Sequence, residues 1–246
     1  MMKFFAALLC VFSGLAHAQP ALLTDLALPY LASAPAQTPS GSAETPLVIF
    51  LHGYGSDERD LFDIKEDLPA DYTYLSVRAP LDVDGGGYKW FSQDTDAADY
   101  EGVTRDVDAS TALLTQFIEQ ASKKYGAKPD KVVLIGFSQG AMMSYQIGLQ
   151  HPELVRGIAP LSGKILSALK ARLKTDDFKG LKVFIGHGTA DTRVAYTGAT
   201  DAKGVLDNLN LAPEFHAYPG LGHSINGSEI SDLNAWLKST LGSEAR

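Results

Sequence analysis

Short apolar runs alternate with segments of helical periodicity along most of the chain, and this alternation limits the possible folds more than any other feature. The runs "PLVIFLH" (46–52) and "KVVLIGF" (131–137) are continuously apolar, as expected of strands buried on both faces. Strands that alternate with helices predict an α/β fold with a mainly parallel central sheet and helices on both faces. Further strands are expected at 72–80, 156–163, 181–188 and 214–220, and helices at 57–68, 103–126, 139–150, 197–210 and 229–240.

The N-terminal residues 1–18, "MMKFFAALLCVFSGLAHA", have the composition of a bacterial secretory signal peptide. One lysine precedes a short apolar run that ends in small residues, so we expect cleavage after Ala18 and a periplasmic or secreted protein. The run is too short to span a bilayer, so stable membrane insertion is not expected. Residues 19–45 form an N-terminal extension, in which "LALPYLA" (26–32) is a possible edge strand.

The net charge limits the classes of binding partner, and the cysteine count limits the use of disulfides. The formal net charge is −8, which argues against nucleic acid or an anionic membrane as the main partner and suits a small neutral or weakly cationic molecule. The one cysteine, Cys10, lies in the predicted signal peptide. The mature chain would then lack disulfides, and its stability must come from a hydrophobic core. Nothing in the sequence indicates an oligomeric state.

The segment "GFSQG" places Ser138 between an apolar strand and a helical pattern, with Gly136 and Gly140 two residues to each side. A serine hydroxyl is a weak nucleophile that needs an exposed position and a base within hydrogen-bond reach. A sharp strand-to-helix turn supplies the exposure, provided that its neighbours are small. The pattern predicts a nucleophilic Ser138, whereas an ordinary glycine-bounded turn is the alternative interpretation.

A nucleophile of this kind requires an acid and a histidine, in the chain order Ser, Asp, His. Asp191 in "HGTADTRV" and His223 in "GLGHSING" both follow predicted strands, at the edge where working groups of a parallel sheet collect. We therefore expect Asp191 to orient His223, which acts as the general base. His187 is the best rival base, although its place before a glycine at a strand end favours a role in the turn.

Two backbone N–H groups are needed for the oxyanion of a tetrahedral intermediate. Gln139 follows the predicted nucleophile and supplies one, and Tyr54 in "LHGYGSD" is the expected second donor. His52 is expected to hold this loop rather than to catalyse. Trp90 and Phe91 are candidates for the wall of an acyl or alcohol pocket, because such pockets are largely apolar and aromatic, with core packing as the alternative.

Six short motifs follow one another along the chain: "FLHGYGSDERD", "RAP", "YKWF", "IGFSQGAMMS", "HGTADTRV" and "GHSI". In this order they resemble the carboxylesterase and acyl-protein thioesterase (phospholipase/carboxylesterase) branch of the α/β-hydrolases. The resemblance implies an α/β-hydrolase catalytic domain over residues 46–246 with little or no lid, no metal and no cofactor. By position it assigns the nucleophile to Ser138, the acid to Asp191 and the base to His223, with Tyr54 and Gln139 at the oxyanion positions.

The sequence thus predicts an exported serine carboxylesterase that acts on small-molecule esters. An exported protein does not meet the lipidated cytosolic proteins on which acyl-protein thioesterases act, which favours a general carboxylesterase. A thioesterase or lysophospholipase remains an alternative within the enzymes. A binding protein without catalytic activity is the alternative of another class, because a fold does not determine a function.

Overall fold

The computed structural model describes residues 20–35, 45–97, 99–173, 178 and 180–242. The predicted signal peptide, residues 1–18, lies outside this part of the chain, as does most of the segment 36–45. Within the described part, no helix is long and apolar enough to cross a membrane. The N-terminal region 20–35 joins the main sheet through a strand, as the sequence predicts for "LALPYLA".

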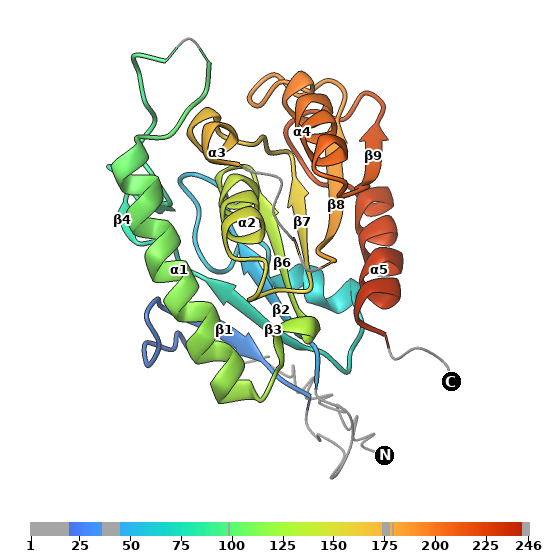
Figure 1. Cartoon of the computed structure of the whole chain (residues 1–246). Helices are drawn as coiled ribbons and strands as arrows, with labels where there is room; N and C mark the ends of the chain where they lie inside the picture. The colour runs from blue at the N-terminus through green and yellow to red at the C-terminus, as the bar shows by residue number, and fades with distance from the viewer. Residues whose placement is uncertain (1–19, 36–44, 98, 174–177, 179, 243–246) are drawn as a thin grey trace, which may run out of the picture.

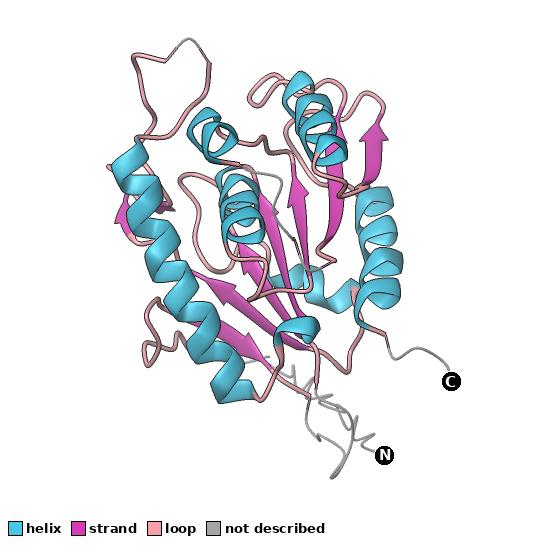
Figure 2. Cartoon of the chain, viewed as in Figure 1, coloured by secondary structure: helices cyan, strands magenta, loops and turns pink. Residues whose placement is uncertain are grey.

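A central sheet of seven strands confirms the predicted α/β fold (Figures 1 and 2). The spatial order is β1-β3-β2-β6-β7-β8-β9, and only β1 runs antiparallel to its neighbour. The strands are β1 (Tyr30–Ser33), β2 (Leu47–Leu51), β3 (Thr73–Val77), β6 (Val132–Phe137), β7 (Gly157–Leu161), β8 (Lys182–Gly188) and β9 (Glu214–Tyr218). The chain leaves β2 toward one edge and later returns to β6 on its other side, so the strand order reverses between β2 and β6. In open α/β sheets a ligand site is expected at such a point, beyond the carboxyl ends of the strands.

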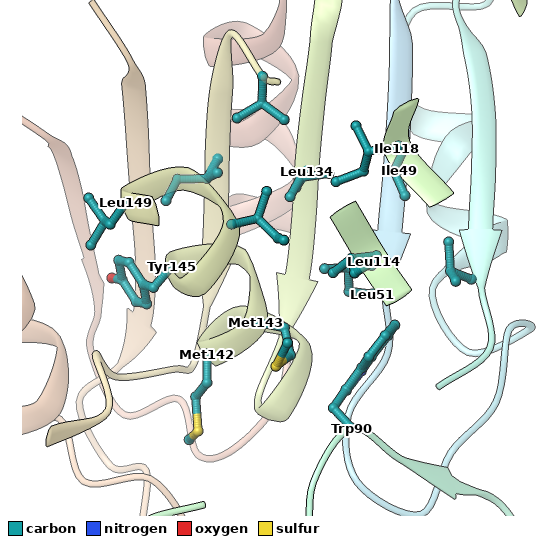
Figure 3. Packing of buried hydrophobic residues seen from close by; sticks show 14 of the residues in the cluster. Ile49, Leu51, Trp90, Leu114, Ile118, Leu134, Met142, Met143, Tyr145 and Leu149 are labelled. Atoms are coloured by element: carbon teal, nitrogen blue, oxygen red, sulfur yellow. The ribbon is translucent and has the colours of Figure 1, made fainter. Parts of the chain in front are cut away.

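Helices cover both faces of the sheet because alternate residues of each buried strand point to opposite sides. Ile49 and Leu51 of β2 belong to the larger core cluster, whereas Val48 and Phe50 belong to the other. Figure 3 shows the larger cluster around α2, with Leu134 and Leu114 among its members. The α-helices are α1 (Thr104–Tyr125), α2 (Gln139–Gln150), α3 (Ser167–Arg172), α4 (Thr197–Asn208) and α5 (Gly227–Leu241).

Two local predictions differ from the structure, and two short elements were not predicted. The segment 57–68 was expected to be a helix, but it contains only the 3₁₀ helix η1 (Phe62–Asp67). The region 81–100 was expected to be irregular throughout, yet β4 (Leu81–Asp82) pairs with β5 (Tyr88–Lys89). The short α3, and a 3₁₀ turn η2 (Pro129–Lys131), have no clear sequence signal, since a single turn shows no periodicity.

One buried carboxyl group lies between the sheet and α5. Glu229 is fully buried, and neither of its carboxyl oxygens has a hydrogen-bond partner within the described chain. It occupies the space beside Gly186 of β8, where a Cβ atom would collide with Glu229 Oε1. Burial raises the pKa of Glu229 to about 8. The backbone of Asn226 lowers this pKa in part, and the negative charge of Asp232 raises it further.

The raised pKa predicts a pH-dependent contribution to stability. The folded protein keeps a proton on Glu229 that the unfolded chain releases near pH 4.5, so the free energy of unfolding falls as pH rises from about 4.5 to about 8. The slope from this group is at most about 1.4 kcal/mol per pH unit. Thermal melting of the wild type and Glu229→Gln across this range measures it. The stability difference between them should change in favour of the variant as pH rises, and a pH-independent difference would contradict the prediction.

Candidate active site

Ser138 lies at the turn between β6 and α2 and has a strained backbone, with φ of 56° and ψ of −115°. Such a turn is possible only because its neighbours are glycines. A Cβ at Gly136 would collide with the carbonyl oxygen of Gly140, and a Cβ at Gly140 would collide with that of Leu51 in β2. The turn therefore presents the Ser138 hydroxyl beyond the end of the sheet, where it keeps partial exposure to solvent.

The structure brings together the three side chains that the sequence proposes for catalysis. Ser138 Oγ lies 2.9 Å from Nε2 of His223, and Nδ1 of the same ring lies 2.7 Å from Oδ2 of Asp191. The ring of Phe137 packs against the imidazole, with a centroid distance of 4.8 Å. These contacts join residues far apart in the chain, and they hold the imidazole in an orientation that allows it to accept a proton from the serine.

Asp191 is held in its ionised form by its surroundings. Burial alone would oppose the charge, but hydrogen bonds from His223 and from the backbone N–H groups of Val194 and Arg193 keep its pKa below the usual value. An ionised Asp191 accepts a hydrogen bond from the N–H at Nδ1 of His223, which leaves the lone pair of Nε2 free to accept a hydrogen bond from Ser138. The electrostatics therefore select the tautomer that a general base needs.

His187 occupies a different place in the same loop. It is fully buried, and its Nε2 donates to the carbonyl oxygen of Val194 at 2.9 Å. The same nitrogen is 3.3 Å from Oδ2 of Asp191, so this carboxylate lies between two histidines. Burial lowers the pKa of His187, which favours its neutral form. These contacts match a role in organising the turn, and it is Nε2 of His223 that accepts the hydrogen bond from Ser138.

The loop after β2 approaches the serine closely. A Cβ built on Gly53 would lie 3.4 Å from Cβ of Ser138, so the backbone of this loop borders the nucleophile. Tyr54 follows and is 54% exposed. Gln139 begins α2, where backbone N–H groups have no partner within the helix. The structure thus places both predicted oxyanion donors on segments that flank Ser138.

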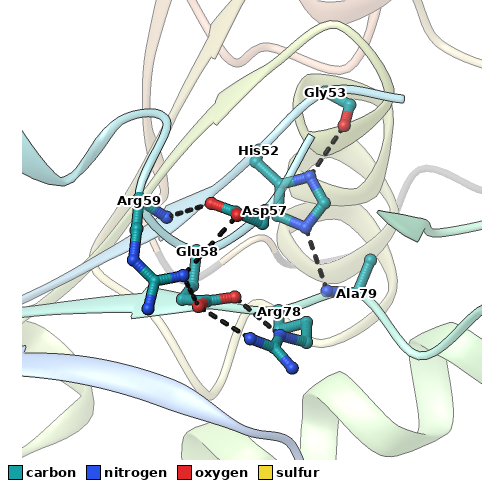
Figure 4. Close-up of polar contacts among 7 residues, drawn as sticks. All are labelled: His52, Gly53, Asp57, Glu58, Arg59, Arg78 and Ala79. Carbon is teal, nitrogen blue, oxygen red and sulfur yellow. Dashed lines mark hydrogen bonds and ion pairs between the residues drawn. The ribbon is translucent and has the colours of Figure 1, made fainter. Parts of the chain in front are cut away.

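His52 and the residues near it anchor this loop (Figure 4). The backbone N–H of Ala79 donates to Nε2 of His52 at 3.1 Å, so Nδ1 carries the proton and donates to the carbonyl oxygen of Gly53 at 2.7 Å. Burial lowers the pKa of His52. Nearby, the fully buried Glu58 accepts two hydrogen bonds from Arg78, at 2.6 and 2.8 Å. The loop is therefore bonded to the two residues that directly follow β3.

Comparison with known proteins agrees with this geometry. The sequence profile of the phospholipase/carboxylesterase family matches residues 34–241. The chain belongs to this family. Acyl-protein thioesterase 1 from Mycosarcoma maydis is 32% identical over 225 residues, which cover 82% of this chain and 94% of the relative. Lysophospholipase-like protein 1 from Mus musculus is 26% identical and covers 84% of this chain and 91% of its own.

Among solved structures, esterase PE8 has a TM-score of 0.73 and 30% identity, over 89% of this chain and 100% of its own. The protein is thus an α/β-hydrolase of the esterase and thioesterase type, which acts on ester bonds. Its relatives carry the names of thioesterase, lysophospholipase-like protein and esterase, so family membership alone leaves the preferred substrate open.

In this family member, the prediction that Trp90 and Phe91 line the substrate pocket is wrong. Both side chains are fully buried in the larger core cluster, and Figure 3 shows Trp90 there. They contact the catalytic loops from the side of the core. Trp90 Nε1 donates to the carbonyl oxygen of His52 at 2.9 Å, and the side chain of Gln139 bonds to the backbone of both aromatic residues at 2.9–3.0 Å. The two rings therefore pack in the core, and the pair contacts the catalytic loops through its backbone and through the indole N–H of Trp90.

A cleft of about 800 Å³ opens above Ser138. Sequence reasoning missed most of its wall, including Tyr100, which stands 39 residues before its hydrogen-bond partner Gln139 in a region without periodicity. Phe137 and Val194 are the apolar side chains of the wall, and most of the remainder is polar or charged. The cleft is lined by Gly53, Tyr54, Ser56, Asp60, Lys89, Ser92, Gln93, Tyr100, Phe137, Ser138, Arg193, Val194 and His223.

The two histidines beside Asp191 predict different mutant behaviour. His223→Ala should lower turnover of an activated ester by several powers of ten, because the serine loses its base. His187→Ala should instead lower the free energy of unfolding by about 1–3 kcal/mol, through loss of a buried hydrogen bond, and leave much of the activity. Turnover and thermal melting of both variants test this. A deeper catalytic defect in a folded His187→Ala protein would show that the wrong histidine has been assigned.

Proposed function

We propose that this protein is an exported serine carboxylesterase that hydrolyses small carboxylic esters through an acyl-enzyme on Ser138. The observation that carries the proposal is the continuous hydrogen-bonded line from Ser138 Oγ through His223 to Asp191, at 2.9 and 2.7 Å. This arrangement can remove a proton from the hydroxyl while the oxygen attacks a carbonyl carbon.

The proposed mechanism follows from the roles that this geometry allows. Nε2 of His223 takes the hydroxyl proton as Ser138 Oγ bonds to the carbonyl carbon, and Asp191 stabilises the resulting imidazolium. Backbone N–H groups of Tyr54 and Gln139 donate to the oxyanion. His223 then protonates the leaving alcohol, which frees it and leaves the acyl group on the serine. A water molecule, deprotonated by the same histidine, hydrolyses the acyl-enzyme and restores Ser138.

The walls of the cleft favour a general carboxylesterase over a thioesterase for long acyl chains. Asp60, Lys89 and Arg193 contribute charged groups, and Ser92 and Gln93 add polar ones. A long alkyl chain gains little in such surroundings, because its stabilisation depends on apolar surface removed from water. Small esters with polar groups fit this lining better.

A binding protein without activity is the competing interpretation of another class. The hydrogen-bonded line argues against it, because a strained Ser138 that contacts a correctly oriented histidine has a cost in stability that ligand binding alone does not explain. Reaction with a fluorophosphonate probe separates the two interpretations, since the probe needs an activated nucleophile.

Ser138→Ala should fold as the wild type does and lose ester turnover by several powers of ten. Hydrolysis of p-nitrophenyl acetate measures turnover, and mass spectrometry detects the fluorophosphonate adduct, which should form on Ser138 in the wild type only. Matched oxygen and thiol esters of one acid report the preference between esterase and thioesterase activity. Wild-type turnover in the alanine variant, or no adduct on the wild type, would refute the assignment.

Export is the second part of the proposal, and it is supported by the signal-like composition of residues 1–18. Expression of the full chain in a Gram-negative bacterium should yield a protein that begins at Gln19 in the periplasm or the medium. A variant without residues 2–18 should stay in the cytoplasm. Intact mass and cell fractionation measure both outcomes, and an unprocessed full chain in the cytoplasm would contradict export.

A further inference from the structure

A second cavity, of about 390 Å³, lies beside the catalytic cleft, and we call it the side cavity. Tyr100 and Val194 line both cavities, so their side chains stand between them. The side cavity also includes the small residues Ala195, Thr197 and Gly198. Its volume falls within the usual range of ligand sites.

Tyr100 is held firmly in this position. Nε2 of Gln139 donates to its hydroxyl oxygen at 2.9 Å, so the tyrosine is bonded to the residue that directly follows Ser138. The ring also meets Phe91 edge to face, with centroids 6.5 Å apart and an angle of 64°. Gln139 is fully buried, which makes the hydrogen bond costly to break.

The residues on each side of Tyr100 are tied down as well. Lys164 Nζ donates to Asp99 at 2.5 Å and to Glu101 at 3.0 Å, and its side chain is only 8% exposed. Glu101 also accepts hydrogen bonds from the backbone and hydroxyl of Ser167, at 3.0 and 2.7 Å. Glu101 is only 14% exposed, so its ion pair with Lys164 is screened weakly and fixes the backbone next to Tyr100, whereas Asp99 is 75% exposed and its ion pair contributes less.

These ion pairs also decide what the side cavity can accept. Lys164 is the most buried charge in its wall, and its two carboxylate partners neutralise it. Small side chains leave the remaining space open. Lys170 and Asp201 also line the cavity, and neither of them is buried. A chain without charge that enters from the catalytic cleft would therefore pass Tyr100 and Val194 and then meet no buried ion other than Lys164, which is paired.

We propose that Tyr100 determines the chain-length specificity of the enzyme by separating the catalytic cleft from the side cavity. With the tyrosine in place, a substrate chain that points toward the side cavity ends at its ring. Without its side chain, the two cavities join and an unbranched uncharged chain can extend into the second one. This inference rests on the proposed esterase function and adds the residue that limits the substrate.

Two variants separate the effect of the Tyr100 ring, which forms the wall, from the effect of its hydroxyl group. Tyr100→Ala removes the ring and opens the side cavity, whereas Tyr100→Phe keeps the ring and loses only the hydrogen bond from Gln139. We expect the ratio of kcat/KM for p-nitrophenyl octanoate to that for p-nitrophenyl acetate to rise at least about tenfold in Tyr100→Ala. The same ratio should stay within about twofold of wild type in Tyr100→Phe. A parallel series of alkyl acetates shows whether the chain that enters belongs to the acid or to the alcohol.

Thermal melting of each variant shows that it is folded, and Tyr100→Leu provides a smaller opening if the alanine protein does not fold. Ratios in Tyr100→Ala or Tyr100→Leu that match the wild type in both series would overturn the inference, as would an equal rise in Tyr100→Phe. Failure of the esterase proposal looks different, because the wild type would then hydrolyse no ester and form no fluorophosphonate adduct. That result would refute the esterase proposal and, with it, the inference about Tyr100.

Discussion

The close packing of the Ser138 turn against the end of β2 is the constraint on which the site depends. Gly140 meets the carbonyl of Leu51 so tightly that a Cβ atom has no room, and Gly53 of the next loop reaches the serine from the other side. This contact joins β2 and β6, the two strands between which the strand order reverses. Backbone packing alone therefore places the nucleophile and the segments of both expected oxyanion donors next to one another.

Around this point, hydrogen bonds fix the tautomer of the three nearby histidines, His52, His187 and His223, and give each a different role. His52 accepts from Ala79 and donates to Gly53, and His187 donates to Val194. Of these three histidines, His223 is the one with a nitrogen that contacts Ser138. Asp191 lies between His187 and His223, and hydrogen bonds from His223 and from two backbone N–H groups keep it ionised. The buried neighbours thus stabilise the one orientation that is useful for proton transfer.

The region 81–103 contributes residues both to the hydrophobic core and to the wall of the catalytic cleft. Its aromatic residues Trp90 and Phe91 pack inside the protein, and their backbone holds the Gln139 side chain. Farther along, Tyr100 comes back over the same glutamine and forms part of two cavity walls. One segment with almost no regular structure therefore both supports the catalytic turn and shapes the space in front of it.

The strand and helix order, the serine turn and the positions of Asp191 and His223 could be read from the sequence, because periodicity and glycine spacing are local properties of the chain. The environment of each group could not. Whether Trp90 faces the cleft or the core, and that the carboxyl oxygens of Glu229 are buried without a partner in the described chain, depend on contacts between distant segments. The sequence by itself determined the fold class and the candidate catalytic groups. Only the tertiary structure decided the wall of the cleft, since irregular segments such as 90–102 take their conformation from what they pack against.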